Sequence, residues 1–282
     1  MKMITRNAII ISCPGSGRKH LPGAVRDLEN MSNYLRSPRG GAWKNHEIFC
    51  LNDPTWPEVK RLLNRCTADY QFIYFAGHGC SGENQTRYLT FKDQNIEDIR
   101  LLTHNTKQLI IVDACRVYYA TISGIPPAED VFSSFTGETD ARNVFDDCIM
   151  RSPNGKIIVH ATGHNTEAKE ERYQRGGAFT LSLLVTALNF RKEYNLQPFY
   201  IKDLLPTVKQ TLISQGYCQS PDIPYEKGTL CIPFMIDVEQ MAIEQDMQEE
   251  QYVLEETPNT TSMLKVIAVT IFIIAFIRGF KN

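Results

Sequence analysis

The chain has 282 residues, of which 43% are hydrophobic, and a formal net charge of −2. This length can build one sizeable core or two small domains, and the near-neutral charge argues against nucleic acid as a partner. The eight cysteines include no Cys-x-x-Cys pair, and the six histidines form no cluster with metal-ligand spacing. We therefore expect reduced thiols in a reducing compartment, with no disulfide framework, no metal site and no cofactor.

The first part of the chain alternates between strand-like and helix-like segments. The predicted strands are 7–13, 46–51, 71–76 and 109–112, and the predicted helices are 21–35, 58–66 and 96–102. The apolar run of the first strand is short and is closed by Pro14, so it predicts a strand rather than a signal peptide. This alternation predicts an α/β fold with a parallel sheet covered by helices on both faces.

The pattern breaks after the fourth strand. Residues 117–140 are rich in turn-forming and polar residues and predict a long mobile loop, with a site for cleavage near Arg142. Further helices are predicted at 141–151, 178–190 and 201–213, and further strands at 156–161 and 229–236. If the last strand lies at the sheet edge, it predicts a homodimer in which this strand pairs with a second copy. These elements define one domain over residues 1–236.

The residues after 236 differ in composition. Residues 237–262 contain eight acidic residues and no basic ones, and they predict a polar linker. Residues 263–280 are almost entirely apolar, with Lys265 and Arg278 near the ends, and predict a marginal C-terminal transmembrane helix. The alternative is an amphipathic or buried terminal helix, but the run is apolar all round, which suits lipid better. We expect a single-pass membrane anchor with the main domain in the cytoplasm, although Arg278 and Lys281 weakly oppose that topology.

Two predicted strands end in reactive side chains. The run Leu109 to Val112 leads into Asp113-Ala114-Cys115, and an earlier apolar strand leads into Gly77-His78-Gly79. Ligands of open α/β sheets bind just beyond the carboxyl ends of the strands, and a histidine partner activates a thiol by helping to form the thiolate. Either residue alone is more simply a structural residue, but the pair predicts a catalytic Cys115–His78 dyad.

These motifs resemble those of the caspase-like cysteine peptidases, peptidase family C14, and most closely the paracaspase, metacaspase and prokaryotic orthocaspase branch. The resemblance rests on Tyr74 to Gly79, on Val112 to Arg116, and on the segment from Ala161 to Phe179. It covers roughly residues 5–236, with the motifs in the family's order and spacing. It implies a caspase-hemoglobinase fold, with a mostly parallel six-stranded sheet between helices, and hydrolysis of peptide bonds in protein substrates.

The resemblance also implies roles for individual residues. Cys115 would be the nucleophile, His78 would transfer the proton, and the backbone N–H groups of Gly79 and Cys115 would stabilise the oxyanion. Asp27, Asp113 and Glu170 match acids that hold a basic substrate side chain in paracaspase-like enzymes. For Asp27, the alternative is a carboxylate that simply favours the start of a helix.

The sequence departs from the family's mammalian-type caspases in ways that bear on specificity. Asp113 and Leu21 stand where those enzymes carry the Gln and Arg that select Asp, so we expect cleavage after Arg, and less readily after Lys. The segment His164 to Thr166 lacks the acidic cluster of many metacaspases, so we expect no calcium dependence. The role implied by the family is limited proteolysis at a membrane. The alternative is a catalytically silent, membrane-tethered interaction module of the same fold.

Overall fold

The computed structural model describes residues 4–82, 86–115, 138–163, 166–171, 175–189 and 199–237. The chain divides into two units, Met1–Asp237 and Val238–Asn282. The predicted linker at 237–262 lies, except for its first residue, outside the described residues, as do the predicted transmembrane helix at 263–280 and most of the predicted loop at 117–140. Among the helices that the structure describes, none is long and apolar enough to cross a membrane.

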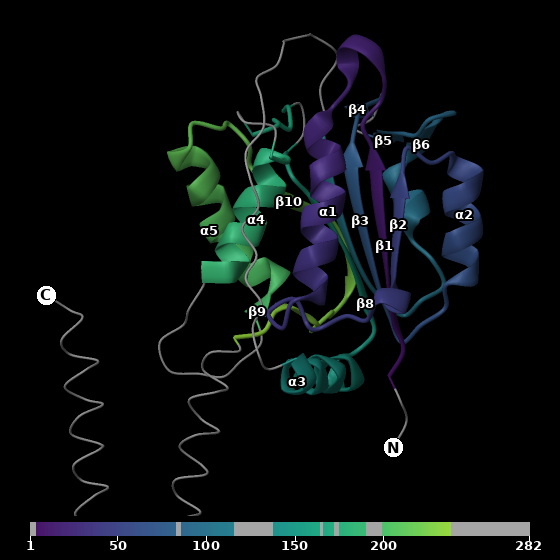
Figure 1. Ribbon diagram of the computed structural model, residues 1–282, viewed down its shortest axis with the longest axis vertical. Coiled ribbons are helices and arrows are strands. Elements are labelled where there is room, and N and C mark those ends of the chain that lie inside the picture. Colours follow the sequence, from purple (N-terminus) through teal and green to yellow (C-terminus); the bar gives the residue numbers. More distant parts are fainter. Residues whose placement is uncertain are drawn as a thin grey trace, which may run out of the picture. The chain divides into compact units, whose positions relative to one another are not determined.

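A six-stranded sheet organises the first unit, in the order β10-β8-β7-β3-β1-β2 (Figure 1). Its strands are β1 (Arg6–Cys13), β2 (Ile48–Asn52), β3 (Tyr70–Gly77), β7 (Lys107–Ala114), β8 (Gly155–His160) and β10 (Asp222–Gly228). All neighbouring pairs are parallel except β8 with β10. The central strands β1 and β3 are buried along their whole length, which explains their unbroken apolar runs. The predicted mostly parallel six-stranded sheet is thus confirmed.

Helices cover both faces of this sheet (Figure 1). The described helices are α1 (Pro22–Arg36), α2 (Trp56–Arg65), α3 (Glu138–Arg151), α4 (Ala178–Asn189) and α5 (Ile201–Ser214), of which α3 lies at the N-terminal end of the sheet. Helix α2 packs its apolar residues against Ile11, Phe75 and Val112 on one face. Helices α1, α4 and α5 lie on the other face, where α1 contacts β1, β3 and α4. The face between α1 and α4 is where the candidate site is built.

Two predicted elements need correction. The strand predicted at 229–236 is too long, because the segment contains β11 only at Pro233–Met235, and this strand pairs with β9 (Phe199–Tyr200) in a separate two-stranded sheet. The edge of the six-stranded sheet is β10, and the predicted pairing of 229–236 with a second copy stays a prediction. The sequence does not predict strand β10, because this strand is half-buried or exposed along its length and so contains no apolar run. It also contains Pro224, which edge strands tolerate.

The predicted helix at 96–102 is the second error. That stretch holds β6 (Asn95–Glu97) and a 3₁₀ turn, Asp98–Leu101. Strand β6 completes a three-stranded antiparallel sheet with β4 (Gly79–Ser81) and β5 (Arg87–Thr90). This small sheet starts directly after His78, so it fixes the chain that leaves the candidate site.

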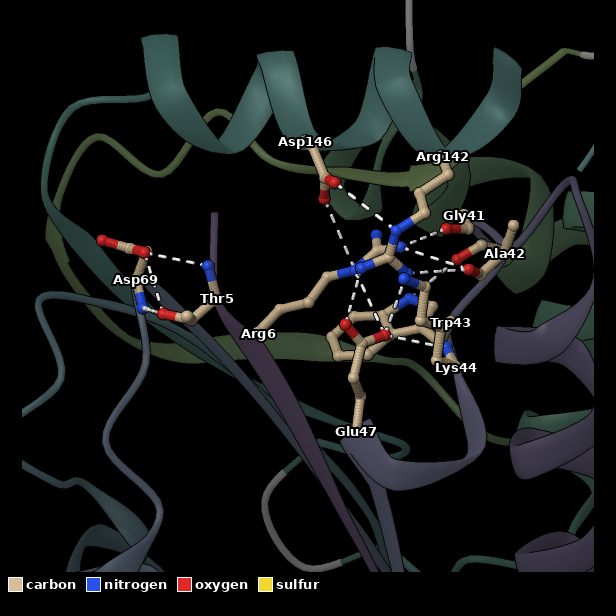
Figure 2. Close-up of polar contacts among 11 residues, drawn as sticks. Thr5, Arg6, Gly41, Ala42, Trp43, Lys44, Glu47, Asp69, Arg142 and Asp146 are labelled. Atoms are coloured by element: carbon tan, nitrogen blue, oxygen red, sulfur yellow. Dashed lines mark hydrogen bonds and ion pairs between the residues drawn. The ribbon is translucent and has the colours of Figure 1, made fainter. Parts of the chain in front are cut away.

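A buried ion cluster holds α3 across the N-terminal end of the sheet (Figure 2). Arg142 donates two hydrogen bonds to Glu47, at 3.0 and 2.6 Å, and Arg6 lies 3.5 Å from Asp146. The guanidinium of Arg6 also lies 4.7 Å from the ring centre of Trp43. Arg142 is therefore a helical, ion-paired residue, whereas most of the loop in which cleavage is predicted lies outside the described residues, so that cleavage stays a prediction.

Candidate active site

His78 and Cys115 follow neighbouring strands at the same edge of the sheet. Strands β3 and β7 are parallel, and Gly77 pairs with Ala114, so the next residues along the two strands are His78 and Cys115. The two backbones approach closely here, because a Cβ atom on Gly79 would lie 2.8 Å from the carbonyl oxygen of Cys115. The structure thus places the backbones of His78 and Cys115 side by side, and it explains why Gly79 carries no side chain.

The imidazole of His78 is held by a loop from the end of β1. Its Nε2 atom lies 2.5 Å from the carbonyl oxygen of Lys19. A carbonyl can only accept a hydrogen bond, so Nε2 carries the proton and Nδ1 of the neutral ring is free to accept one. The loop fits against the ring only because Gly15 has φ +70° and no side chain; a Cβ there would lie 2.9 Å from Cδ2 of His78.

The thiol of Cys115 points toward the segment after β8. Sγ donates a hydrogen bond to the carbonyl oxygen of Ala168, at 3.1 Å, and the residue is half-buried. Burial raises the pKa of the Cys115 thiol, and the positive charge of nearby Lys169 opposes this effect only in part. The thiol is therefore protonated at neutral pH, and a reaction at Sγ needs a base to remove its proton.

Asp27, Asp113 and Glu170 come together on the α1/α4 side of the sheet, and we call them the acidic cluster. Each carboxylate is fixed by one backbone N–H group. These bonds are Gly177 N to Asp27 Oδ2 at 2.8 Å, Thr180 N to Asp113 Oδ2 at 3.2 Å, and Gly23 N to Glu170 Oε1 at 2.6 Å. Gly177 makes room for two of them, because a Cβ there would lie 2.2 Å from Asp113 Oδ2 and 3.0 Å from Asp27 Oδ2.

The three acids of the cluster differ in how far they are exposed to solvent. Asp27 is 1% exposed, Asp113 is 6% exposed and Glu170 is half-buried. Within the described ranges, Oδ1 of Asp27 is a buried oxygen with no hydrogen-bond partner. This free oxygen, and the second oxygen of each other carboxylate, leave the cluster able to accept hydrogen bonds from a guest.

The charges of the cluster oppose one another. Burial, and next the charge of Asp113, hold the pKa of Asp27 well above its ordinary value. Burial also raises the pKa of Asp113 to about 6, and that of Glu170 in the same direction. The three acids therefore oppose one another's ionisation, because like charges that are buried together disfavour the charged form. A cation that enters would relieve this repulsion.

The sequence predicted the side chains of the site but not what surrounds them. The carbonyl groups of Lys19 and Ala168 that contact His78 and Cys115 belong to the main chain, so the residue types at these positions do not predict the contacts. Tyr74 and Thr180 look like ordinary core residues in the sequence, although the hydroxyl of Thr180 contacts Asp113 and that of Tyr74 contacts Thr180. Among the described residues, no group of three or more His, Cys, Asp or Glu side chains could hold a metal ion.

Comparisons with known proteins agree with the fold. The family model for the caspase domain matches residues 5–231. The crystal structure of caspase-1 from Spodoptera frugiperda is similar, with a TM-score of 0.51 and 16% sequence identity, over 79% of this chain and 88% of that chain. None of the curated proteins matches the sequence. The match of the caspase-domain model over most of the chain confirms the predicted resemblance to the caspase-like peptidases of family C14, whereas the closer likeness to the paracaspase, metacaspase and orthocaspase branch stays a prediction.

Proposed function

Because the chain belongs to the caspase-domain family, peptidase family C14, we propose that it is a cysteine endopeptidase that cleaves protein chains after arginine, and less readily after lysine. The single observation that carries this specificity is the acidic cluster, which lies against the residues leading to the candidate nucleophile. Asp113 is both a member of the cluster and the residue two positions before Cys115. A substrate side chain held by the cluster would therefore place its own carbonyl group near Sγ.

The proposed reaction uses two side chains and two backbone donors. When the hydrogen bond from Sγ to Ala168 breaks, Nδ1 of His78 takes the thiol proton and Sγ attacks the scissile carbonyl carbon. The N–H groups of Gly79 and Cys115 would stabilise the oxyanion. The C–N bond then breaks, His78 returns the proton to the leaving amine, and water hydrolyses the thioester to release the acid and regenerate the thiol.

The specificity follows from the hydrogen bonds that the cluster leaves unmade. Each carboxylate uses one oxygen to accept a backbone N–H and keeps the other for a guest. A guanidinium offers five N–H donors in a planar fork and can bind two carboxylates at once, whereas an ammonium is a compact, strongly hydrated charge. An aspartate side chain would be repelled and would supply no donor to the second oxygen of each acid.

A comparison of matched peptides tests the proposal. Fluorogenic peptides that differ only in an Arg, Lys or Asp residue before the cut should be cleaved in the order Arg, then Lys, with no measurable cleavage after Asp. The Cys115→Ala variant is the control and should cleave none of them. Equal or faster cleavage after Asp would overturn the specificity. If an arginyl chloromethyl ketone fails to label Cys115, the chain is instead a silent interaction module.

We also propose that the peptidase is attached to a membrane through residues 263–280, with its N-terminal unit in the cytoplasm. The support is the apolar composition of this segment, which approaches the length of about 20 residues needed to span a bilayer. The full-length chain should sediment with membranes after lysis without detergent, and a chain truncated at residue 262 should not. Recovery of the full-length chain in the supernatant would contradict the anchor.

A further inference from the structure

A short chain of hydroxyl groups leads from the protein core to Asp113. The phenol oxygen of Tyr74 lies 2.5 Å from Oγ1 of Thr180, and this Oγ1 donates to Oδ2 of Asp113 at 2.7 Å. Tyr74 and Thr180 are both 0% exposed. Tyr74 belongs to β3, Thr180 to the first turn of α4, and Asp113 to β7, so three separate elements meet at this point.

The donor and the acceptor of each hydrogen bond can be assigned because each hydroxyl group carries a single proton. An ionised carboxylate only accepts hydrogen bonds, so the single hydroxyl proton of Thr180 is committed to Asp113. Oγ1 is then left to accept from Tyr74, whose phenol also makes a side-chain hydrogen bond with Asp27. Burial, and then the charges of Asp27 and Asp113, raise the pKa of Tyr74 well above its ordinary value, so this donor keeps its proton. The hydroxyl proton of Thr180 therefore points toward Asp113, and the phenol of Tyr74 supports both Thr180 and Asp27.

This arrangement also selects which oxygen of Asp113 meets a guest. Oδ2 accepts both the N–H and the hydroxyl proton of Thr180, and among the described residues these are the hydrogen bonds that Asp113 receives. A structural role for Thr180, as a helix-start residue that packs in the core, would need only its N–H group and its shape. The hydroxyl proton adds a second donor to a buried carboxylate, and such donors favour the charged form.

We propose that Thr180, supported by Tyr74, is a positioning residue that keeps Asp113 ionised and turns its free oxygen toward the basic side chain of the substrate. This inference rests on the proposed function, since it concerns the same acidic cluster. It adds a specificity determinant that lies behind the acids and touches no substrate.

The charged neighbours of Asp113 define what a pH profile would report. Asp27 faces it from α1, Tyr74 from β3, Glu170 from the segment after β8, and Cys115 from its own strand. Helix α4 adds no charge, because Ala178–Asn189 contains no acidic or basic residue. Thr180 therefore acts on Asp113 as a neutral hydrogen-bond donor, and a change of pH profile on its replacement reports the carboxylate.

Three variants of the full chain test the inference. Thr180→Val keeps the branched shape and removes the hydroxyl, Thr180→Ser keeps the hydroxyl, and Tyr74→Phe removes the phenol that supports Thr180 and Asp27. We expect Thr180→Val to raise KM for an arginyl peptide about tenfold and to shift the acidic limb of kcat/KM upward by about one pH unit, with a smaller change in kcat. Thr180→Ser should resemble the wild type, and Tyr74→Phe should lie between them. A wild-type KM and pH profile in Thr180→Val would overturn the inference.

A second measurement separates this inference from the proposed function. Carboxyl carbons of ¹³C-labelled aspartate can be titrated by NMR without substrate, and Asp113→Asn identifies the signal. Thr180→Val should raise the titration midpoint of Asp113, while an unchanged midpoint would refute the positioning role even in a chain that cleaves nothing. Conversely, a raised midpoint in a chain that fails to cleave arginyl peptides would keep the positioning role and refute the peptidase specificity.

Discussion

Asp113→Asn should stabilise the protein at neutral pH while it removes most activity on arginyl substrates. Burial raises the pKa of Asp113 from 3.8 to about 6. Since each pKa unit corresponds to 1.36 kcal/mol, ionising Asp113 in the folded protein costs about 3 kcal/mol relative to the unfolded chain. Asparagine keeps the shape of the side chain and can accept the same hydrogen bonds from Thr180, but it carries no charge.

The sign of this effect depends on pH. Between pH 3.8 and about 6 the folded protein holds a proton on Asp113 that the unfolded chain has lost, so stability falls as pH rises through this window. The cost is complete at about pH 7.5 and absent at about pH 3.5, which lies below both pKa values. Asp113→Asn should therefore raise the free energy of unfolding by up to about 3 kcal/mol at the higher pH and change it little at the lower one.

Urea unfolding at both pH values measures the stability, and arginyl peptide hydrolysis measures the activity. Loss of one partner of a buried charged contact costs on the order of 2–5 kcal/mol, so kcat/KM should fall roughly 30-fold or more. Alkylation of Cys115 by iodoacetamide should persist, which shows that the nucleophile is intact. A variant that is less stable than the wild type at neutral pH, or that cleaves arginyl peptides at the wild-type rate, would refute the reasoning.

Further predictions concern the dyad, its support and the charge of the cluster. Cys115→Ala and His78→Ala should each abolish peptidase activity without altering the circular dichroism spectrum, and residual cleavage by Cys115→Ala would remove the assignment of the nucleophile. Gly15→Ala should lower kcat on arginyl peptides by an order of magnitude or more, because the new Cβ displaces the imidazole; an unchanged kcat would show that the ring tolerates the shift. Activity should survive excess EGTA, and a sharp calcium requirement would contradict the prediction that the segment from His164 to Thr166 holds no calcium. Binding of L-argininamide should release protons near pH 6, because a bound cation lowers the raised pKa values of the buried acids; heats of binding that do not depend on the buffer would count against this release.

The sequence predicts the centre of the fold better than its edges. The predicted ends of strands β1, β3 and β7 lie within two residues of the observed ends, because a strand buried on both faces must be an apolar run. The edge strand β10 was missed because solvent accepts its polar residues, and only pairing with β8 makes it a strand. Local pattern cannot report that partner.

The same distinction applies to the candidate site. The strand-end residues His78 and Cys115 could be predicted because neighbouring strands in a parallel sheet end at one edge. Asp27 and Glu170 were found only through the family resemblance, since nothing in their local sequence shows that they meet across more than 140 residues. Their chemical roles remain predictions, whereas their proximity is a property of the structure.

On the proposed function, the acidic cluster makes the reaction depend on a basic side chain in the substrate. Without a guest, buried carboxylates repel one another, and the Cys115 thiol is protonated and hydrogen-bonded to Ala168. On the proposed function, a basic side chain of the substrate would neutralise the cluster. The same binding event that relieves the repulsion would therefore bring the scissile carbonyl group to the thiol and His78. The free energy of binding the basic side chain to the acidic cluster would thus help to position the scissile carbonyl group at Sγ. Substrate selection would in this way be coupled to catalysis.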